Sequence, residues 1–245
     1  MNDFNKIYWD KQTTKNGYCE LFSQEASKNN WLGMMEKALK KTKVTNFKNI
    51  LEIGGGSQFL SRYFCEKYPN AKVLCTDISG KRLDVFQNYY VKKPTNLTLI
   101  GNVNAEQLSF ADGEFDLIIG DAIISQLQDC KKGLLEINRC LAKNGHAIFI
   151  REPVVGYFNI FACKLFQLMN KKSFFEKYRP ENKKFLNQWI YDFMLAGLKV
   201  KAIGGWNSRK VIDRIKSIFP KIFPCFIIFI LEKKFDLDHN NIIHK

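Results

Sequence analysis

Leu51-Glu52-Ile53-Gly54-Gly55-Gly56-Ser57 is the stretch of sequence that decides the fold. A short β-branched run, residues 49–53, leads directly into three glycines, and a pattern with helical spacing follows to about Tyr68. Glycines let the backbone turn tightly and approach a ligand where a Cβ would collide. The start of a helix offers unpaired N–H groups and a partial positive charge. The sequence therefore predicts a strand, a glycine turn and a helix capped by Ser57, facing an anionic group such as a carboxylate.

Short β-branched runs alternate with longer amphipathic segments from about residue 48 onward. This order is typical of a parallel sheet covered by helices. The predicted strands are 49–53, 72–76, 97–100, 115–119 and 146–150, with further candidates at 198–203 and 224–231. Ser79 is predicted to cap the helix after the second strand, and Asn144-Gly145 to form the turn before the fifth. We therefore expect an α/β fold with an open, doubly wound sheet.

Asp77 closes the second predicted strand, 21 residues beyond Gly56. An acid near this offset reaches a ribose diol in nucleotide-binding folds. The dinucleotide fingerprint G-x-G-x-x-G is not met, because Phe59 stands at its last glycine position. Glu52 would also repel a pyrophosphate, whereas it suits a ligand with a free ammonium group. These parts together predict a nucleoside-containing ligand at the carboxyl edge of the sheet.

Residues 48–152 resemble the class I S-adenosylmethionine-dependent methyltransferases, in particular the small-molecule branch typified by quinone and lipid methyltransferases. The motif (D/E)-x-G-x-G-x-G of this family is matched by residues 52–58, except that Gln58 replaces the last glycine. Residues 104–110 match its D-A-x-x-L-P-F loop with Asn104 in place of Asp, and Asp116 lies in its F-D-x-(I/V) strand. Residues 136–145 look like its E-x-x-R-x-L-K-P-G-G segment. The resemblance implies a Rossmann-like, mostly parallel seven-stranded sheet with helices on both faces and an antiparallel last strand.

The resemblance also implies S-adenosyl-L-methionine as the cofactor and assigns its contacts. Asp77 is assigned to the ribose hydroxyls, and the loop that begins at Asn104 to the adenine. The residues expected to bind the cofactor are Glu52, Gly54, Gly55, Gly56, Asp77, Ile78, Asn104, Ala105 and Asp121.

A histidine general base is not expected, because the three histidines (146, 239 and 244) lie outside the predicted pocket loops. Methyl transfer from a sulfonium is an in-line displacement, in which positioning alone supplies much of the rate. Where a proton must be removed, Asp121 and Glu152 at the strand ends are the available bases. No metal site is expected, because the pair His239 and His244 has no further ligand nearby.

The net charge of the chain indicates which kinds of molecule it binds. Lys and Arg number 38 and Asp and Glu 24, which gives +14, and residues 151–245 hold 18 of the former but only 8 of the latter. Residues 157–169 are apolar and aromatic, and the segment that follows to Lys184 is basic. We expect an apolar acceptor pocket with a basic rim, suited to a hydrophobic, amphiphilic or anionic small molecule, lipid-like and taken from an anionic membrane.

Three alternatives remain open from the sequence. The basic C-terminal surface also suits an RNA methyltransferase, although no RNA-binding module accompanies the core and residues 120–123 are not the (N/D)-P-P-(Y/F) motif of exocyclic-amine methylation. Gln58 and the missing histidine are also compatible with a cofactor-binding, non-catalytic partner subunit. A nicotinamide dehydrogenase is a distant third.

The organisation expected is one methyltransferase domain over residues 1–245. It comprises an N-terminal helical cap (1–47), the cofactor core (48–152), an acceptor-side insert (153–197) and C-terminal strands with a tail (198–245). Seven scattered cysteines without a CxxC pair indicate reduced thiols, and the longest apolar run, of ten residues at 222–231, falls short of the roughly 20 of a membrane span. We expect a cytoplasmic protein with peripheral membrane contact. The acceptor, the methylated atom and the oligomeric state stay open.

Overall fold

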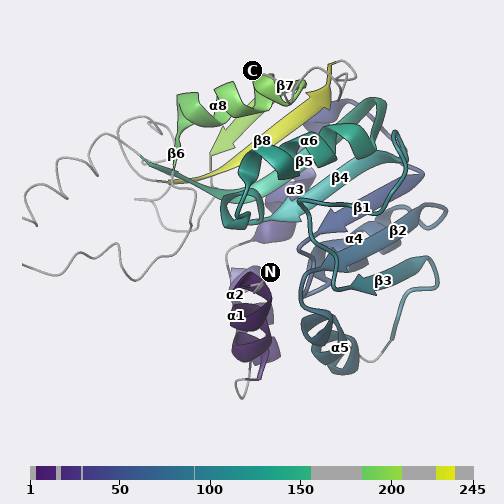
Figure 1. The fold of residues 1–245 in the computed structure, drawn as a ribbon. Helices are drawn as coiled ribbons and strands as arrows, with labels where there is room; N and C mark the ends of the chain where they lie inside the picture. Colours follow the sequence, from purple (N-terminus) through teal and green to yellow (C-terminus); the bar gives the residue numbers. More distant parts are fainter. Residues whose placement is uncertain are drawn as a thin grey trace, which may run out of the picture.

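The computed structural model describes residues 4–14, 18–28, 30–90, 92–155, 184–205 and 225–234. They form one eight-stranded sheet in the order β3-β2-β1-β4-β5-β8-β7, with β6 paired to β5 (Figure 1). The strands are β1 (Asn49–Ile53), β2 (Lys72–Asp77), β3 (Leu97–Gly101), β4 (Phe115–Asp121), β5 (Leu141–Val155), β6 (Lys184–Phe185), β7 (Leu198–Gly205) and β8 (Cys225–Lys233). Strands β1 to β5 pair in parallel, and β8 runs antiparallel to both β5 and β7. The predicted α/β sheet with an antiparallel last strand is confirmed. The structure also contains the short strand β6, which is not among the predicted strands.

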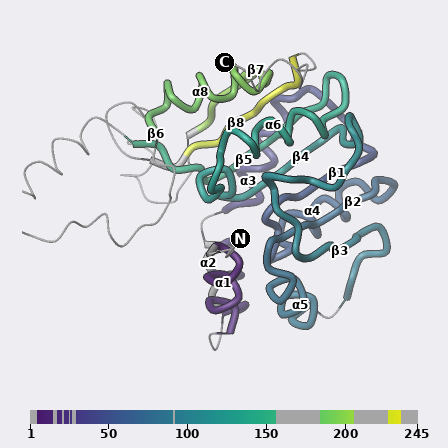
Figure 2. The backbone as a smooth tube through the Cα atoms, in the orientation of Figure 1, coloured from purple at the N-terminus to yellow at the C-terminus, as the bar shows by residue number. Residues whose placement is uncertain are grey.

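Helices cover both faces of this sheet, and Figure 2 traces the chain from α1 and α2 to α8 and β7. They are α1 (Phe4–Thr13), α2 (Tyr18–Lys28), α3 (Trp31–Thr42), α4 (Phe59–Lys67), α5 (Gly80–Tyr89), the 3-10 turn η1 (Ile124–Gln126), α6 (Cys130–Cys140) and α8 (Leu186–Leu195). The Ser79 hydroxyl accepts a hydrogen bond from the Arg82 N–H, so the predicted cap of α5 is confirmed. None of the described helices is long and apolar enough to cross a membrane. The apolar stretch 157–169 lies outside the described residues.

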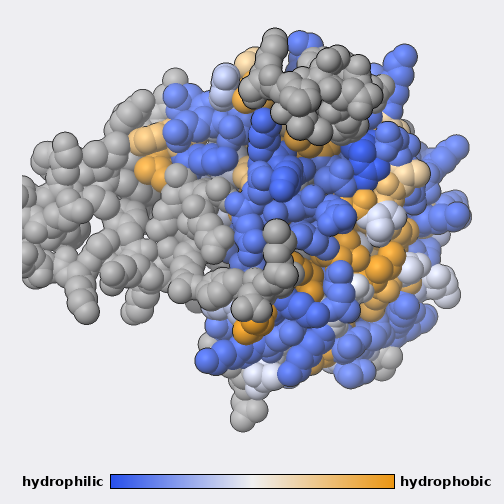
Figure 3. Space-filling model, in the orientation of Figure 1, coloured by the Kyte–Doolittle hydropathy of each residue, from blue (hydrophilic) through white to orange (hydrophobic). Residues whose placement is uncertain are grey.

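Two hydrophobic layers sandwich the sheet because successive strand residues point to opposite faces. Leu51 and Ile118 belong to the layer under α6 and α8, which includes Trp189. Ile50 and Leu117 belong to the layer under α3 and α4. Outside these layers, Figure 3 shows a mostly hydrophilic surface with hydrophobic residues gathered over the half that holds β1–β4. The strand residues are therefore apolar on both faces, as expected for a buried parallel sheet.

Strand β1 lies between β2 and β4, so the direction in which the chain adds strands reverses there. Ligands of open α/β sheets bind beyond the carboxyl ends of the strands at such a reversal. The glycine turn that follows β1 lies at this position. The topology thus places the predicted cofactor loop where a ligand crevice is expected.

The start of α4 differs from the prediction that Ser57 caps it. The helix begins at Phe59, and its N-cap is Gln58, which makes no side-chain cap bond. The turn extends further than expected because the Gln58 N–H donates to the Gly55 carbonyl at 2.6 Å. The Glu52 carboxylate, at the end of β1, instead accepts a bond from the Ser61 N–H at 2.9 Å. A strand residue therefore takes over the role assigned to Ser57.

The predicted turn at Asn144-Gly145 lies inside β5 as an irregularity of the strand. Phe115 pairs with Leu141 and Leu117 with His146, so two steps along β4 oppose five steps along β5. Asn144 takes the left-handed conformation that this excursion needs, with φ 62°. The turn lies at the predicted residues, but β5 begins at Leu141, before the turn rather than after it.

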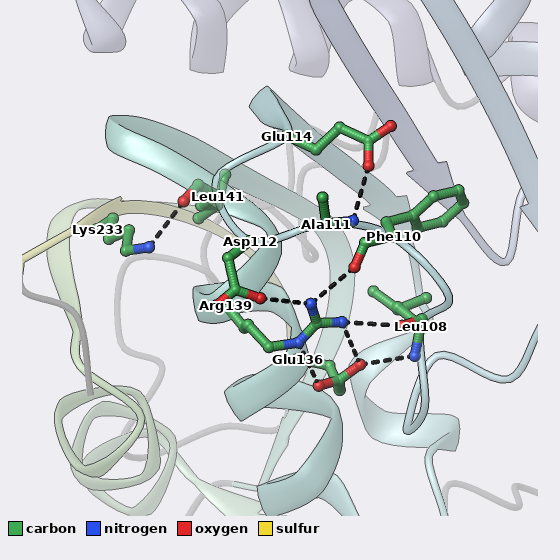
Figure 4. A network of polar contacts seen from close by, with 9 residues as sticks. All are labelled: Leu108, Phe110, Ala111, Asp112, Glu114, Glu136, Arg139, Leu141 and Lys233. Carbon is green, nitrogen blue, oxygen red and sulfur yellow. Dashed lines mark hydrogen bonds and ion pairs between the residues drawn. The ribbon is translucent and has the colours of Figure 1, made fainter. Parts of the chain in front are cut away.

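The E-x-x-R segment lies at the amino end of β4, where its Arg139 forms a network of hydrogen bonds (Figure 4). All five N–H groups of Arg139 donate hydrogen bonds. The acceptors are the Glu136 and Asp112 carboxylates and the carbonyls of Leu108 and Phe110. The Glu136 carboxylate also accepts from the Leu108 N–H at 2.7 Å. The network ties α6 to the loop that precedes β4.

Replacing Arg139 by Lys is expected to lower the free energy of unfolding by about 1–3 kcal/mol, because an ammonium leaves several of these acceptors unpaired. Urea denaturation of the purified chain measures the change. Lys132→Gln removes an exposed ion pair with Asp129 on the same helix and should change it by less than about 0.5 kcal/mol. Equal effects of the two substitutions would contradict a structural role of the Arg139 network.

Candidate functional site

Three glycines form the turn that follows β1, and other side chains pack closely against each of them. A Cβ on Gly54, at φ +66°, would come within 2.6 Å of the Ile123 side chain. A Cβ on Gly56 would come within 2.4 Å of Arg82 Cδ. The Gly55 N–H donates to the Thr76 carbonyl of β2 at 2.8 Å. The turn therefore requires glycine for its own packing, besides the close approach that it offers a ligand.

Glu52 lies buried beneath this turn, with 2% of its surface exposed. One oxygen accepts from both the backbone N–H and the hydroxyl of Ser61 at the start of α4. Burial raises the pKa of the Glu52 carboxyl to about 7, the charge of Asp121 adds to the rise, and the bonds from Ser61 oppose it. The structure gives Glu52 a role in holding α4 to β1, and its contact with a ligand ammonium group stays a prediction.

Asp77 joins the end of β2 to the glycine turn. Its two oxygens accept from the N–H groups of Gly56 and Ser79, both at 2.8 Å, and Arg82 lies 3.8 Å away as an ion-pair partner. Asp77 is 3% exposed, and burial raises its pKa while Arg82 and the two backbone bonds oppose the rise. A carboxylate offers about four acceptor positions, so ribose hydroxyls can still be accepted beside these bonds.

Helix α1 spans the two loops that flank the glycine turn. Asn5 Nδ2 donates to the Gln126 carbonyl, in η1 after β4, at 2.9 Å. The Asp10 carboxylate accepts from the Ser79 hydroxyl after β2. Between them the Arg82 guanidinium lies 4.5 Å from the centre of the Trp9 ring. The N-terminal cap predicted for residues 1–47 thus includes a helix that is held across the candidate site.

Arg82 carries an orphaned polar atom within this site. The residue is 8% exposed, yet its Nε has no hydrogen-bond partner in the described part of the chain. The same Nε would lie 2.7 Å from a Cβ on Gly56. A buried donor without a partner costs free energy and indicates a polar ligand or water at that place.

The ends of β4 and β5 are joined by an ion pair. Arg151 donates through Nε and Nη2 to the two oxygens of Asp121. The guanidinium also lies 3.5 Å from the centre of the Trp31 ring of α3. Both side chains are mostly buried, at 19% and 12% exposed. Asp121 is therefore at the predicted strand end, but both its oxygens are engaged by Arg151.

Glu152 holds the loop after β4. It is fully buried, and its carboxylate accepts from the N–H groups of Ile123, Ile124 and Ser125 at 2.8–3.1 Å. Burial raises the pKa of Glu152 to about 7, and these bonds oppose the rise. A base must reach its substrate, so the structure favours a loop-holding role over the proton transfer expected from the sequence.

The loop after β3 brings the predicted adenine-side residues to the same edge. The Val103 N–H donates to the Asp77 carbonyl at 3.0 Å, which ties the loop to the end of β2. Asn104 is exposed, and its side-chain oxygen accepts from the Glu106 N–H at 2.9 Å. Ile78 is half-buried and Ala105 buried beside them. These residues are near Asp77, and their contact with adenine stays a prediction.

Left-handed backbone conformations mark this edge of the sheet. The non-glycine residues with positive φ there are Gln58, Asn102 and Ala122, in the loops after β1, β3 and β4, and Arg151, inside β5. Gln58 stands where the family motif has its last glycine, and it takes the conformation that a glycine adopts most easily, with φ 56°. Its buried amide donates to the Leu83 carbonyl at 2.8 Å, which offsets part of the strain. Such strain clusters at ligand sites.

Sequence reasoning missed the cationic half of the site. Arg82, Arg151 and Trp31 were not among the expected residues, although Arg82 lies five positions after Asp77 on the helix that begins there. Arg151 gave no signal, because nothing in the sequence indicates its left-handed backbone or its partner. Among the described residues no group of three His, Cys, Asp or Glu side chains is arranged to hold a metal ion.

The buried carboxyls make stability depend on pH. Because the pKa of Glu152 is about 7 when folded and about 4.5 in the unfolded chain, the folded chain keeps a proton between these values that the unfolded chain has released. The free energy of unfolding should therefore fall as pH rises from 5 to 7, by at most about 3 kcal/mol for this residue. Glu152→Gln should flatten the dependence, measured by urea denaturation at several pH values.

Glu114→Gln is the matched control, since this exposed carboxylate also accepts a backbone bond, from Ala111. It should leave the pH dependence in place. An unchanged slope in Glu152→Gln would contradict the assignment.

Known proteins share this sequence pattern and fold. The family model described as "Methyltransferase domain" matches residues 51–149. The ubiquinone/menaquinone biosynthesis C-methyltransferase UbiE of Francisella tularensis subsp. novicida is 28% identical over 128 residues, which is 49% of this chain and 50% of that protein. The malonyl-[acyl-carrier protein] O-methyltransferase of Geobacter sulfurreducens is 29% identical over 97 residues, 39% of this chain and 35% of the relative. This chain thus spans about half the length, or less, of the curated relatives it matches.

Solved structures agree on the fold. A putative methyltransferase of Haloferax volcanii, in complex with the methyltransferase activator Trm112, aligns with a TM-score of 0.68 at 13% identity, covering 92% of this chain and 97% of that one. A putative methyltransferase of Bacillus halodurans aligns with a TM-score of 0.59 at 12% identity, covering 82% and 100%. S-adenosylmethionine is the methyl donor that these matches imply. The family match over residues 51–149, the relatives and the shared fold together support a class I S-adenosylmethionine-dependent methyltransferase.

Proposed function

We propose that the chain transfers a methyl group from S-adenosylmethionine to a small hydrophobic, amphiphilic or anionic acceptor. The observation that carries the proposal is the bond from the Gly56 N–H to the buried Asp77 carboxylate. It joins a glycine turn and an acid at the carboxyl edge, where the sheet order reverses. A nucleoside with a short, charged extension fits across such a junction.

The residues present fit this cofactor in kind. The acid at the end of β2 has acceptor positions left for ribose hydroxyls, and the unpartnered Nε of Arg82 lies beside it. A second buried donor without a partner, Trp31 Nε1, belongs to the ring that stacks on Arg151. We assign the ribose to Asp77, the turn at 54–56 to the methionyl part, and the loop at 104–105 to the adenine.

S-adenosylmethionine supplies a methyl group on a sulfonium, so the leaving group is already activated. What the chain adds is position: the glycine turn and the loops after β2 and β4 are fixed by buried carboxylates, and α1 lies across them. Alignment of reactants supplies about 7–11 kcal/mol in favourable cases. Asp121 is engaged by Arg151 and His146 lies where β5 pairs with Leu117, toward the other end of β4. The proposal therefore rests on positioning rather than on a strong general base.

The acceptor class is supported by the sequence and by the names of the relatives. The aromatic and basic residues of 157–183 lie outside the described residues, so the pocket predicted there stays a prediction. One relative is named for ubiquinone and menaquinone biosynthesis and another for malonyl-[acyl-carrier protein], which are hydrophobic and anionic compounds. Helix α8, which follows this segment, exposes large apolar side chains: Ile190, Tyr191, Met194 and Leu195. An exposed apolar patch of this kind suits contact with an amphiphile or a membrane surface.

Asp77→Asn should weaken binding of S-adenosylhomocysteine by about tenfold or more, because hydrogen bonds to a charged acceptor contribute about 1.5–3 kcal/mol. Isothermal titration calorimetry measures the dissociation constant. Asp116→Asn is the matched control: Asp116 also accepts two backbone bonds, from Lys48 and Asn49, but at the amino end of β1. Equal weakening in both variants would contradict the ribose assignment.

Radiolabelled methyl transfer into cell extract, fractionated into lipid, RNA, protein and small metabolites, tests the acceptor class. We expect label in the lipid or small-metabolite fraction. Label in RNA would favour an RNA methyltransferase instead. Binding of S-adenosylhomocysteine without label in any fraction would favour a non-catalytic partner subunit, and binding of a nicotinamide cofactor a dehydrogenase.

A further inference from the structure

We propose that Arg151 is the anion-binding residue of the acceptor half of the site, and that the methyl acceptor carries a carboxylate or phosphate. This rests on the proposed function, which it deepens by naming a charged group of the substrate. The argument uses the hydrogen bonds of Arg151, its backbone conformation and its place on the sheet.

The ion pair with Asp121 uses one side of the guanidinium. Nε and one hydrogen of Nη2 face the carboxylate, so both hydrogens of Nη1 and the second of Nη2 are left without an acceptor among the described residues. These three lie at the end of the guanidinium, where two parallel N–H bonds match a carboxylate or phosphate. Asp121 and the Trp31 ring hold the group in place from two directions. A second oxyanion can therefore bind end-on without displacing Asp121.

Arg139 shows what a purely structural arginine looks like in this chain. It is exposed to a similar extent as Arg151, 17% against 19%, yet all five of its donors bind acceptors of the chain (Figure 4). Among the described residues, three of the five N–H donors of Arg151 find no acceptor. The difference indicates that the free end of Arg151 serves something outside the described chain.

The backbone at Arg151 is strained to place this side chain. Its φ is +58°, and it lies in a bulge, since three steps of β5 from Phe149 to Glu152 oppose two steps of β8. Bulges beside active sites redirect side chains, and the left-handed conformation is unfavourable for a residue other than glycine. At the carboxyl edge of the sheet, this backbone conformation brings the Arg151 guanidinium to Asp121.

The position of β5 assigns this anion to the acceptor. The expected cofactor contacts lie at the carboxyl ends of β3, β2, β1 and β4, and β5 is the next strand beyond β4. Arg151 is thus on the far side of Asp121 from the ribose acid Asp77. The carboxylate of the cofactor's own methionyl group is the other source of the same chemistry, and the experiment below separates the two.

The test compares charged and neutral aromatic probes by saturation-transfer difference NMR. Benzoate and phenyl phosphate are titrated against benzamide at constant ionic strength, with and without S-adenosylhomocysteine. We expect the unmodified chain to bind at least one anion about fivefold more tightly than benzamide. Arg151→Gln should bring the ratio to about one, and Arg151→Lys should keep only part of it, because an ammonium lacks the fork. Arg139→Lys should leave the ratio unchanged even though it lowers stability.

A ratio of about one in the unmodified chain, or an unchanged ratio in Arg151→Gln, overturns the proposal. Calorimetry with S-adenosylhomocysteine and with 5′-methylthioadenosine, which lacks the amino-acid part, separates the two sources. If Arg151→Gln weakens only the former, by tenfold or more, the anion is the cofactor's and the acceptor assignment is overturned. Failure of the unmodified chain to bind either nucleoside overturns the proposed function instead, and the probe ratio without them still decides the role of Arg151.

Discussion

Backbone N–H groups that donate to buried carboxylates fix the carboxyl edge of this sheet, and the candidate site depends on them. Glu52 accepts from the start of α4, Asp77 from the glycine turn and the start of α5, and Glu152 from the whole turn after β4. The glycine turn and the loops after β2 and β4 are thus attached to strands by hydrogen bonds to carboxylates. Buried carboxylates are costly unless hydrogen-bonded, so the loops and the acids stabilise one another. Burial raises the pKa of Glu52 and of Glu152 to about 7, and the hydrogen bonds oppose this rise.

The strands could be predicted closely from the sequence because apolar, β-branched runs between turn residues leave few alternatives. Runs such as Asn49–Ile53 and Phe115–Asp121 begin where expected, and the pairing order follows the connection rules of parallel sheets. The E-x-x-R motif was also informative, since Arg139 uses all its donors to tie a helix to a loop. These features are local, or are set by one periodic pattern.

The distribution of charge in the site could not be predicted in the same way. In the sequence, Glu152 follows a predicted strand, as an accessible acid would. In the structure, the loop after β4 folds over it and donates hydrogen bonds to both of its oxygens. Arg151 depends on a bulge that the pairing of β5 with β8 creates, and those strands are more than 70 residues apart in the chain. A motif records which residues stand near a turn, whereas their partners are set by distant segments. The expected site residues therefore lie together at one edge of the sheet, whereas the arginines beside them could not be predicted.

The attachment of α1 has a consequence for the timing of ligand exchange. Two hydrogen bonds and one cation–π contact, each worth about 1 kcal/mol, join this helix to the loops on either side of the glycine turn. Breaking them requires no strand of the sheet to separate, so the helix can swing open as a local event far less costly than global unfolding. The residence time of a nucleoside beside the glycine turn would then depend on this local opening, and substitutions at Asn5 or Asp10 would change dissociation rates more than the shape of the bound state.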